Sequence, residues 1–573
     1  MIELSIFDPV WSKPASLSSV MLDPLGLDRT SDRMKAGLLI GIISLTDRAR
    51  YYSFYSWVIK NVNETENFAR FVDFRNVFLD RVRSYCLACI SHSESNVSSD
   101  HSSLQGLIKG RPKWREGGRY VQVQGFRHLG NPLGGYGYYY QASMNYLGLT
   151  EHELTRDVLT PLGRKLADAF EQKISDTQYF KKFIGKEAIP RDVFQDYGSK
   201  CCICLMSEAD SPDRNILREI MFNLVPSRGV QTNIILHKRR KQSLSLILFL
   251  VSELSKYSVN IDEVMFLDSI YFGQFKKGMK IISIRFPQYL NDVVEKWRLL
   301  RCHDYFSYAC ETLLTVFLKA LDAHRMDGLS FEDFMAILDE KRISDKLGTI
   351  LHQRSSKVLS LNAALNQLTM ISTSDKKSTF SSSTSKMFDE KCRLELSINE
   401  SNLLRKVEKE AESNRATPIS QVATSVTALL VLFARFYHKH SSNDSNWSWL
   451  RKMTETDLSP YHLIKDLEPK VFDPNFSIHD FLFWIYKEYI IKQSETVFYG
   501  KINSLYSIPK PFFHKDKNAY RVDRLYSPRF RDSRFSSSFS ILRDLNLCKK
   551  SGAFYKLTLD GDALLERTIG GQQ

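Results

Sequence analysis

The chain has 573 residues, of which 43% are hydrophobic and 25% are charged, a composition that excludes wholesale disorder, collagen-like repeats and a polytopic membrane protein. At roughly 150 residues per domain, this length predicts three or four folding units instead of one core. The 79 Lys and Arg residues outnumber the 65 Asp and Glu residues, and the resulting net charge of +14 favours a polyanionic partner such as nucleic acid.

Apolar runs along the chain are short. Leu244–Val251 and Leu429–Ala434 fall well below the ~20 residues that a membrane-spanning helix needs. The opening stretch Met1–Trp11 carries acidic residues where a signal peptide has a basic start and an apolar core. We therefore expect a cytoplasmic protein without a membrane partner.

The first clear helical pattern follows Thr46, a favourable N-cap residue, and runs over residues 48–60. Apolar residues recur along it at helical spacing and mark one face. Arg48 and Arg50 lie near the start of this helix, beside two tyrosines. An arginine in this position can bind a phosphate or hold an internal acidic partner, and the second role is the more common on an aromatic helix.

Two short segments hold most of the excess positive charge. Lys109–His128 contains six Lys or Arg residues and one acidic residue, and Lys510–Arg534 contains eight against three, so each segment carries a net charge of +5. Aromatic residues alternate with the cations, as in surfaces that contact phosphates and stack on bases. The alternative is that the aromatic residues pack in a core or a hairpin while the charges face water. The candidate nucleic-acid-binding residues are Lys109, Arg111, Lys113, Trp114, Arg115, Arg119, Arg127, Lys515, Lys517, Arg521, Arg524, Arg529 and Arg531.

An internal repeat is the most informative pattern in the chain. The motif L-x-L, followed ten residues later by L-T-x-x-G-x-x-L, begins at Leu147 and again at Leu545, with every position shifted by 398. This order predicts a helix, a short hairpin and a second helix that starts at the Gly turn. The pattern resembles the wing of bacterial winged helix-turn-helix regulators. The alternative is an ordinary strand-turn-helix edge used for packing or dimerisation.

The rest of the chain is mainly helical in pattern. The sequence predicts a mainly α fold with small β hairpins (α+β), in a multidomain helical protein with one or two winged-helix-like modules. The expected parts are an N-terminal helical domain over residues 1–180 ending in the first module, a central helical domain over 181–371, a Ser-rich linker over 372–394, and a C-terminal helical domain over 395–573 ending in the second module.

Nine cysteines in a chain without an export signal are best interpreted as reduced thiols. Cys86 and Cys89, followed by His92, and the pair Cys201 and Cys204 have spacings that zinc sites use. The first pair lies near the end of an amphipathic stretch, and the second lacks the Gly and polar turn residues of a zinc knuckle. Buried structural thiols are therefore favoured, and we expect no metal and no cofactor. The common hydrolase, metalloprotease and kinase motifs are missing from the sequence, and no catalytic residue is expected.

The N-terminal run from Asp23 to Leu27, with Thr46-x-Arg48-x-Arg50-Tyr-Tyr further on, resembles a group of uncharacterised bacterial proteins from phage-defence and mobile-element loci. This chain departs from the group at Ile40, where a proline is expected. The resemblance implies a genomic context and no activity.

These patterns lead to one main hypothesis, an accessory protein of bacterial genome or phage defence that contacts DNA phosphates, with RNA also open and with protein partners in a defence complex. A protein–protein adaptor or scaffold subunit, and a metal-dependent nuclease without a readable motif, are the alternatives.

Overall fold

The computed structural model describes residues 23–569 apart from 66–70, 97–99, 127–130, 154–155, 209–210, 225–233, 279, 351–360, 362–363, 365–416, 442–443, 456, 472, 474 and 503–509. The expected Ser-rich linker over 372–394 lies outside the described residues. The fold is mainly α-helical, and its strands form small antiparallel sheets of two or three strands, as the sequence predicts.

The chain divides into two compact units, and each consists of separate stretches of sequence. Unit 1 comprises residues 1–34 and 298–531, and unit 2 comprises residues 35–297 and 532–573. The helices α1 (Leu27–Leu38) and α11 (Asn291–Ala323) contribute residues to both units. Residues 532–573 therefore belong to the same unit as residues 35–297. The consecutive domains expected from the sequence do not include such an arrangement.

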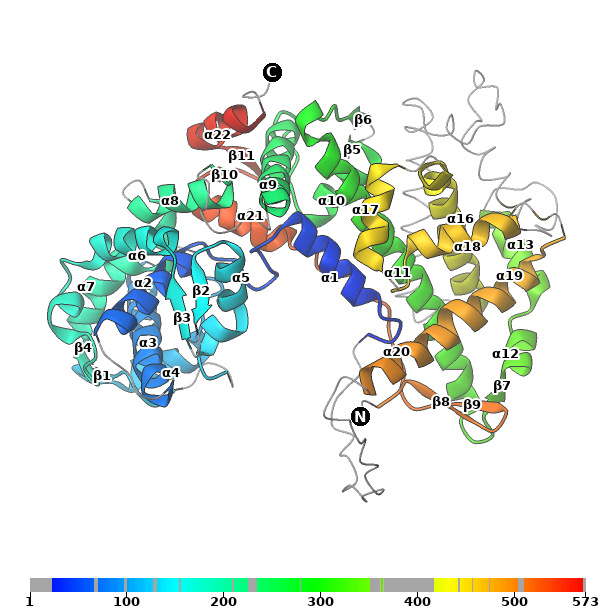
Figure 1. Cartoon of the computed structure of the whole chain (residues 1–573), viewed down its shortest axis with the longest axis horizontal. Helices are drawn as coiled ribbons and strands as arrows, with labels where there is room; N and C mark the ends of the chain where they lie inside the picture. The colour runs from blue at the N-terminus through cyan, green and yellow to red at the C-terminus, as the bar shows by residue number, and fades with distance from the viewer. Residues whose placement is uncertain are drawn as a thin grey trace, which may run out of the picture. The chain divides into compact units, whose positions relative to one another are not determined.

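Unit 2 contains most of the features that the sequence singles out. In its core, α2 packs against α6 and α3 against α7 (Figure 1). Its helices are α2 (Arg50–Thr65), α3 (Phe71–Ser95), α4 (Leu107–Glu116), α5 (Gln141–Tyr146), α6 (Pro161–Ile174), α7 (Arg191–Cys201), α8 (Pro212–Met221), α9 (Ile234–Ser255), α10 (Glu263–Phe272), α21 (Phe535–Asp544) and α22 (Leu559–Ile569). Short 3₁₀ or π turns join some of them, among them η1 (Tyr136–Tyr140) and η3 (Ile203–Ser207).

In the described part of the chain, the strands of unit 2 form four separate two-stranded antiparallel sheets. The pairs are β1 (Tyr120–Gln122) with β4 (Ala188–Pro190), β2 (Thr150–Glu153) with β3 (Arg156–Leu159), β5 (Gln274–Lys277) with β6 (Lys280–Ser283), and β10 (Cys548–Ser551) with β11 (Phe554–Leu557). Three of these pairs are hairpins, whereas β1 and β4 come from distant parts of the sequence.

Residues 50–59 of α2 are buried on every side of the helix and not on one face alone. Tyr51, Tyr52 and Phe54 are each at most 2% exposed, and their rings contact neighbouring aromatic rings. The helix begins at Arg50, two residues later than the pattern predicts. Thr46 does not cap it, because the Thr46 hydroxyl instead accepts from the amide of Ile43 and donates to its carbonyl.

Unit 1 is a helical assembly whose described strands form a three-stranded sheet of order β7-β9-β8. Its elements besides α1 and α11 are β7 (Leu329–Ser330), α12 (Phe331–Ile337), α13 (Glu340–Ile350), α16 (Pro418–Ser441), α17 (Ser445–Thr454), α18 (Pro460–Val471), α19 (Ile478–Trp484), η7 (Ile485–Ile491), α20 (Lys492–Ile502), β8 (Phe513–Asp516) and β9 (Ala519–Val522). One described stretch, Pro418–Tyr437 in α16, has the length and composition of a membrane span, but 89% of its apolar window is buried, as in a core helix.

Candidate nucleic-acid interface and metal centre

The first basic segment forms α4 and the chain that follows it. Gly110 lets α4 approach α3 closely, because a Cβ atom there would lie 2.7 Å from Cδ1 of Ile90. With Gly110 turned inward, all three cations are exposed on the outer surface of the helix, with Arg111 and Arg115 on one flank and Lys109 on the other. Arg119, which follows the helix, is also exposed. The predicted cations of this segment therefore face water, except that Lys113 is half-buried and Arg127 lies outside the described residues.

Trp114 does not lie on this surface, and its assignment as a nucleic-acid-binding residue is wrong for this conformation. Its side chain is 2% exposed. The indole Nε1 donates to a carboxylate oxygen of Glu94 at 2.7 Å, and the guanidinium of Arg191 covers the ring at 4.3 Å from its centroid. The indole packs within unit 2, where it anchors α4, so Trp114 cannot stack on a base.

The second basic segment uses its arginines within unit 1. Arg531 is paired with Glu311 and Asp28, and Glu311 is fully buried. Burial raises the pKa of Glu311, and the adjacent Arg531 opposes that shift. Arg529 also pairs with Asp28 at 3.2 Å. Arg529 and Arg531, two of the residues predicted to contact phosphates, are therefore held in internal ion pairs.

Two further arginines of the second segment are also engaged. Arg521 pairs with Asp516 at 3.3 Å and donates to the carbonyl of Met326 at 2.9 Å. The guanidinium of Arg524 lies 3.8 Å from the ring centroid of Phe512. Among the predicted residues of this segment, only Lys515 in β8 and Lys517 in the turn after it are exposed without an ion pair to a described residue, and Lys515 lies 5.5 Å from the ring centroid of Tyr520. Its net charge therefore overstates its free positive surface.

The internal repeat corresponds to two modules, each made of a helix, a two-stranded β-hairpin and a second helix, with the same hydrogen bonds in both. Thr160 and Thr558 cap the second helix of each module, and each hydroxyl accepts from the amide of Gly163 or Gly561 at 3.1 Å. Each glycine is required by close approach, since a Cβ atom would lie 2.0 Å from the carbonyl oxygen of Leu149 in the first module and 2.1 Å from that of Leu547 in the second.

The two hairpins carry opposite charge. The exposed residues of β2–β3 include Glu151 and Glu153. The β10–β11 hairpin instead exposes Lys549, Lys550 and Lys556, with no ion pair to them among the described residues. These lysines are not among the predicted contacts, although the run of lysines in the expected hairpin was a usable signal. Because α21, which precedes this hairpin, is largely buried against α9 and α10, it cannot enter a DNA groove in this conformation.

Arg48 and Arg50 are buried and hold internal partners. Arg48 Nε lies 3.0 Å from the carboxylate of Asp544, and Arg48 is 3% exposed. Arg50 lies 3.5 Å from the carboxylate of Asp213 and donates to the hydroxyl of Ser211 at 2.7 Å. Burial opposes the charged form of both guanidinium groups, but the carboxylates outweigh it and raise their pKa. Neither arginine is accessible to a phosphate.

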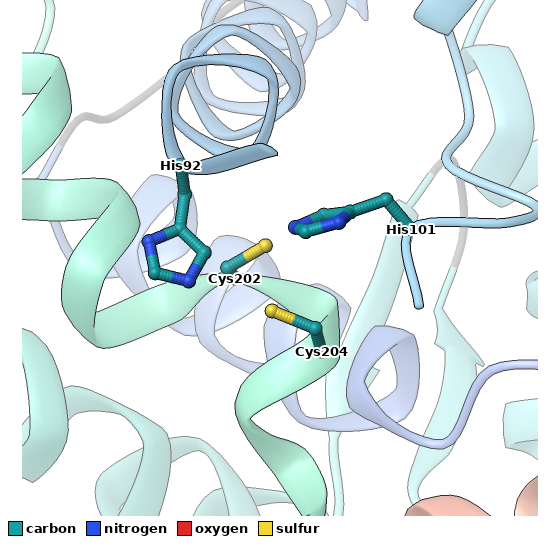
Figure 2. Close-up of side chains that lie close together, drawn as sticks. All are labelled: His92, His101, Cys202 and Cys204. Carbon is teal, nitrogen blue, oxygen red and sulfur yellow. The ribbon is translucent and has the colours of Figure 1, made fainter. Parts of the chain in front are cut away.

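A group of four metal-ligating side chains lies next to these arginines. His92 near the end of α3, His101 in the loop before α4, and Cys202 and Cys204 at the junction of α7 and η3 each offer one ligand atom, and these atoms all lie within 4.8 Å of one another. Figure 2 shows the two sulfur atoms between the two imidazole rings. Burial raises the pKa of the Cys202 thiol, and a hydrogen bond with Cys202 together with burial raises the pKa of the Cys204 thiol to about 11.

The residues of this group are not the ones that the cysteine spacings in the sequence suggest. His92 and Cys204 are members, but the other residues of both pairs, Cys86, Cys89 and Cys201, are buried outside it. For these three thiols, the expectation of a structural role fits their burial. The remaining members are His101 and Cys202. The two histidines and the two cysteines lie about 100 residues apart in the sequence, so spacing within either pair does not reveal the group.

No family model, curated protein or solved structure matches this chain. The chain's own residues are therefore the guide to its function.

Proposed function

We propose that this chain binds nucleic-acid phosphates through the outer side of α4, with duplex DNA as the first ligand to test. The observation that carries the proposal is the exposure of Lys109, Arg111 and Arg115 on one short helix. None of the three forms an ion pair with a residue that the structure describes. Unpaired cations of this kind can replace the counterions of a phosphate backbone, which is the main source of sequence-independent affinity.

The geometry of α4 supports a fixed set of contacts. Arg111 and Arg115 are four residues apart, so their side chains leave the same side of the helix about 5–6 Å from each other at Cβ. Gly110 and Trp114, which lie about 100° around the helix from these arginines, hold α4 against the core. Because α4 is held in place, its backbone loses little entropy on binding, and each guanidinium group can bind one phosphate through two hydrogen bonds.

The β10–β11 hairpin supplies further unpaired cations in the same unit. Lys549 and Lys556 are paired across the hairpin and share one face, and Lys550 is exposed on the other face. A wing presents cations to a phosphate backbone in this way. We include this hairpin as a second contact. The acidic β2–β3 hairpin is left out, because carboxylates repel phosphates.

The role in bacterial genome or phage defence is part of the same proposal, and its support is the resemblance of the N-terminal run to proteins of such loci. RNA as the ligand stays open. The nuclease alternative gains no support from the four metal-ligating residues, because sulfur and imidazole donors suit Zn²⁺ better than the hard Mg²⁺ ion of two-metal nucleases.

The test is a fluorescence anisotropy titration of the full chain with duplex DNA, single-stranded DNA and duplex RNA at several salt concentrations between roughly 50 and 200 mM. The variant carries Lys109→Ala, Arg111→Ala and Arg115→Ala. The control removes the same charge from exposed positions on three helices of unit 1, with Lys341→Ala, Lys452→Ala and Lys465→Ala.

Loss of three phosphate contacts is expected to reduce the slope of log affinity against log salt by about 2.7, since each contact on duplex DNA contributes about 0.9. The control variant should keep the slope of the natural chain. An equal slope for the α4 variant and the natural chain would contradict the proposal. No binding at the lowest salt would favour the adaptor alternative.

A further inference from the structure

We propose that His92, His101, Cys202 and Cys204 bind one Zn²⁺ ion as a closed, tetrahedral Cys₂His₂ centre. The ion would fix the loop that carries His101 and leads into α4. The four ligand atoms come from three separate parts of unit 2 and already lie within 4.8 Å of one another. The centre forms whether or not the chain binds nucleic acid.

The donor set identifies the class of metal. Two thiols and two imidazoles are the ligands of structural zinc sites, with Zn–S distances of about 2.3 Å and Zn–N distances of about 2.0–2.1 Å. In a tetrahedron of that size the ligand atoms lie about 3.3–3.8 Å apart, so the present spacing needs to contract by at most about 1.5 Å. Small rotations of the four side chains about their χ angles can supply this movement. All four positions are filled by protein ligands, which is typical of a structural and not a catalytic zinc site.

The main chain around the four residues is held in place by other contacts. Arg48 donates to the carbonyls of Asp100 and Ser102, at 3.1 and 2.8 Å, which flank His101. It also donates at 3.2 Å to the carbonyl of Ile203, which lies between the two cysteines. One buried guanidinium therefore fixes both the loop that carries His101 and the turn that carries the thiols.

The histidine of α3 is positioned by a close helix contact. A Cβ atom on Gly198 of α7 would lie 2.2 Å from the carbonyl oxygen of Ala88 and 3.2 Å from Cβ of His92. Only glycine lets α7 run this close to α3, and four residues later α7 gives way to Cys202. Arg50 adds a hydrogen bond of 3.1 Å to the carbonyl of Lys200, just before the cysteines. The main chain that carries the four ligands is thus held in place by contacts that do not involve a metal.

The charge of the proposed centre balances. Each cysteine gives up its thiol proton to the solvent when its sulfur binds the ion, and both imidazoles bind in their neutral form. Two thiolates then neutralise the two positive charges of Zn²⁺. The ion therefore adds no net charge to a largely buried site, and this avoids the cost of burying an uncompensated ion.

The experiment measures zinc in the full-length chain, purified without a histidine tag and analysed by mass spectrometry of the metal after exposure to excess Zn²⁺ and desalting. We expect about one zinc per chain, as for a single closed site. The variant is Cys202→Ala, which should lose the zinc. The matched control is Cys201→Ala, which removes the adjacent buried thiol and should retain it. Equal zinc content in these two variants, or zinc well below one per chain in the natural protein, would overturn the proposal.

A second measurement needs no variant and so does not depend on the folding of one. X-ray absorption at the zinc edge of the natural chain should show two sulfur ligands at about 2.3 Å and two nitrogen ligands at about 2.0–2.1 Å. A first shell of oxygen and nitrogen atoms alone would mean that zinc binds elsewhere, and it would contradict the assignment.

Discussion

Arg48 and Asp544 form a buried ion pair within unit 2, with Arg48 Nε and a carboxylate oxygen of Asp544 3.0 Å apart. The same oxygen accepts from the amide of Ala49 at 2.9 Å, just before α2 begins. The pair therefore joins the start of α2 to the end of α21. Because both charges are buried, removing either one would leave the other buried without a partner.

Replacing Arg48 should destabilise unit 2 strongly. Arg48→Ala leaves the carboxylate of Asp544 buried and unpaired, for which the expected loss is about 3–5 kcal/mol. The measurement is the shift of the urea unfolding transition of unit 2. As a control, Arg164→Ala removes one partner of the exposed pair with Glu64 and should cost no more than about 1 kcal/mol. Similar losses for the two variants would show that Arg48 and Asp544 contribute little as a pair.

The two glycines of the repeat should be intolerant of alanine. In a helix, Gly→Ala normally gains about 1 kcal/mol, but Gly163→Ala or Gly561→Ala places a Cβ atom about 2 Å from a carbonyl oxygen. We expect this clash to outweigh the gain and to give a net loss of about 1–3 kcal/mol in the free energy of unfolding. Gly118→Ala, where no atom lies within 4 Å of the added Cβ, is the control and should change stability by less than about 0.5 kcal/mol. A stabilised Gly561→Ala variant would contradict the close approach of α22 to the carbonyl of Leu547.

The stability of unit 2 should depend on pH through His237. Burial, with a smaller effect of Arg240, lowers the pKa of His237 to about 4 in the folded chain, from about 6.5 in an unfolded one. Between these values the unfolded chain binds a proton that the folded chain does not, so stability is fully present above pH 6.5 and falls as the pH decreases toward 4.

The measurement for His237 is the difference in unfolding free energy between the natural chain and His237→Gln at several pH values. This difference should change across pH 6.5 to 4, because the variant lacks the titrating group. The exposed residue His479 provides the control, since His479→Gln should leave the pH dependence as in the natural chain. A difference that is constant with pH would show that His237 is not held in its neutral form.

The two hairpins should respond differently to charge removal if the chain binds DNA as proposed. Lys549→Ala, Lys550→Ala and Lys556→Ala together should lower the salt slope of binding by up to about 2.7, at about 0.9 per phosphate contact. Neutralising the first hairpin with Glu151→Gln and Glu153→Gln should leave the slope unchanged. If the glutamate variant lowered the salt slope as much as the lysine variant, the proposed DNA contact of the β10–β11 hairpin would be contradicted.

Local patterns predicted the parts of this fold that depend on nearby residues. The repeat was visible because Thr160 and Gly163, and Thr558 and Gly561, make their contacts within about 15 residues of sequence. The mainly helical class followed from periodicity for the same reason.

Contacts between distant residues account for what the sequence could not reveal. Trp114 is buried because Arg191, 77 residues away, hydrogen bonds to its carbonyl and covers its ring. Arg531 is used by Asp28, at a separation of 503 residues. The choice of Cys202 over Cys201 depends on which side of the turn after α7 faces His92 and His101, and spacing alone does not determine this.

Unit 2 is built from two stretches of the chain that are far apart in the sequence, and this has a consequence for its folding during synthesis. A ribosome releases residues 35–297 long before it makes α21, and 234 residues of unit 1 are synthesised in between. Until Asp544 emerges, Arg48 has no carboxylate of α21 to neutralise it. Completion of unit 2 must therefore wait until α21 and α22 have been made, and such long-range closure is slow. Until then, the side of α9 that later contacts α21 and α22 is uncovered, and exposed apolar surface of this kind is what chaperones protect during synthesis.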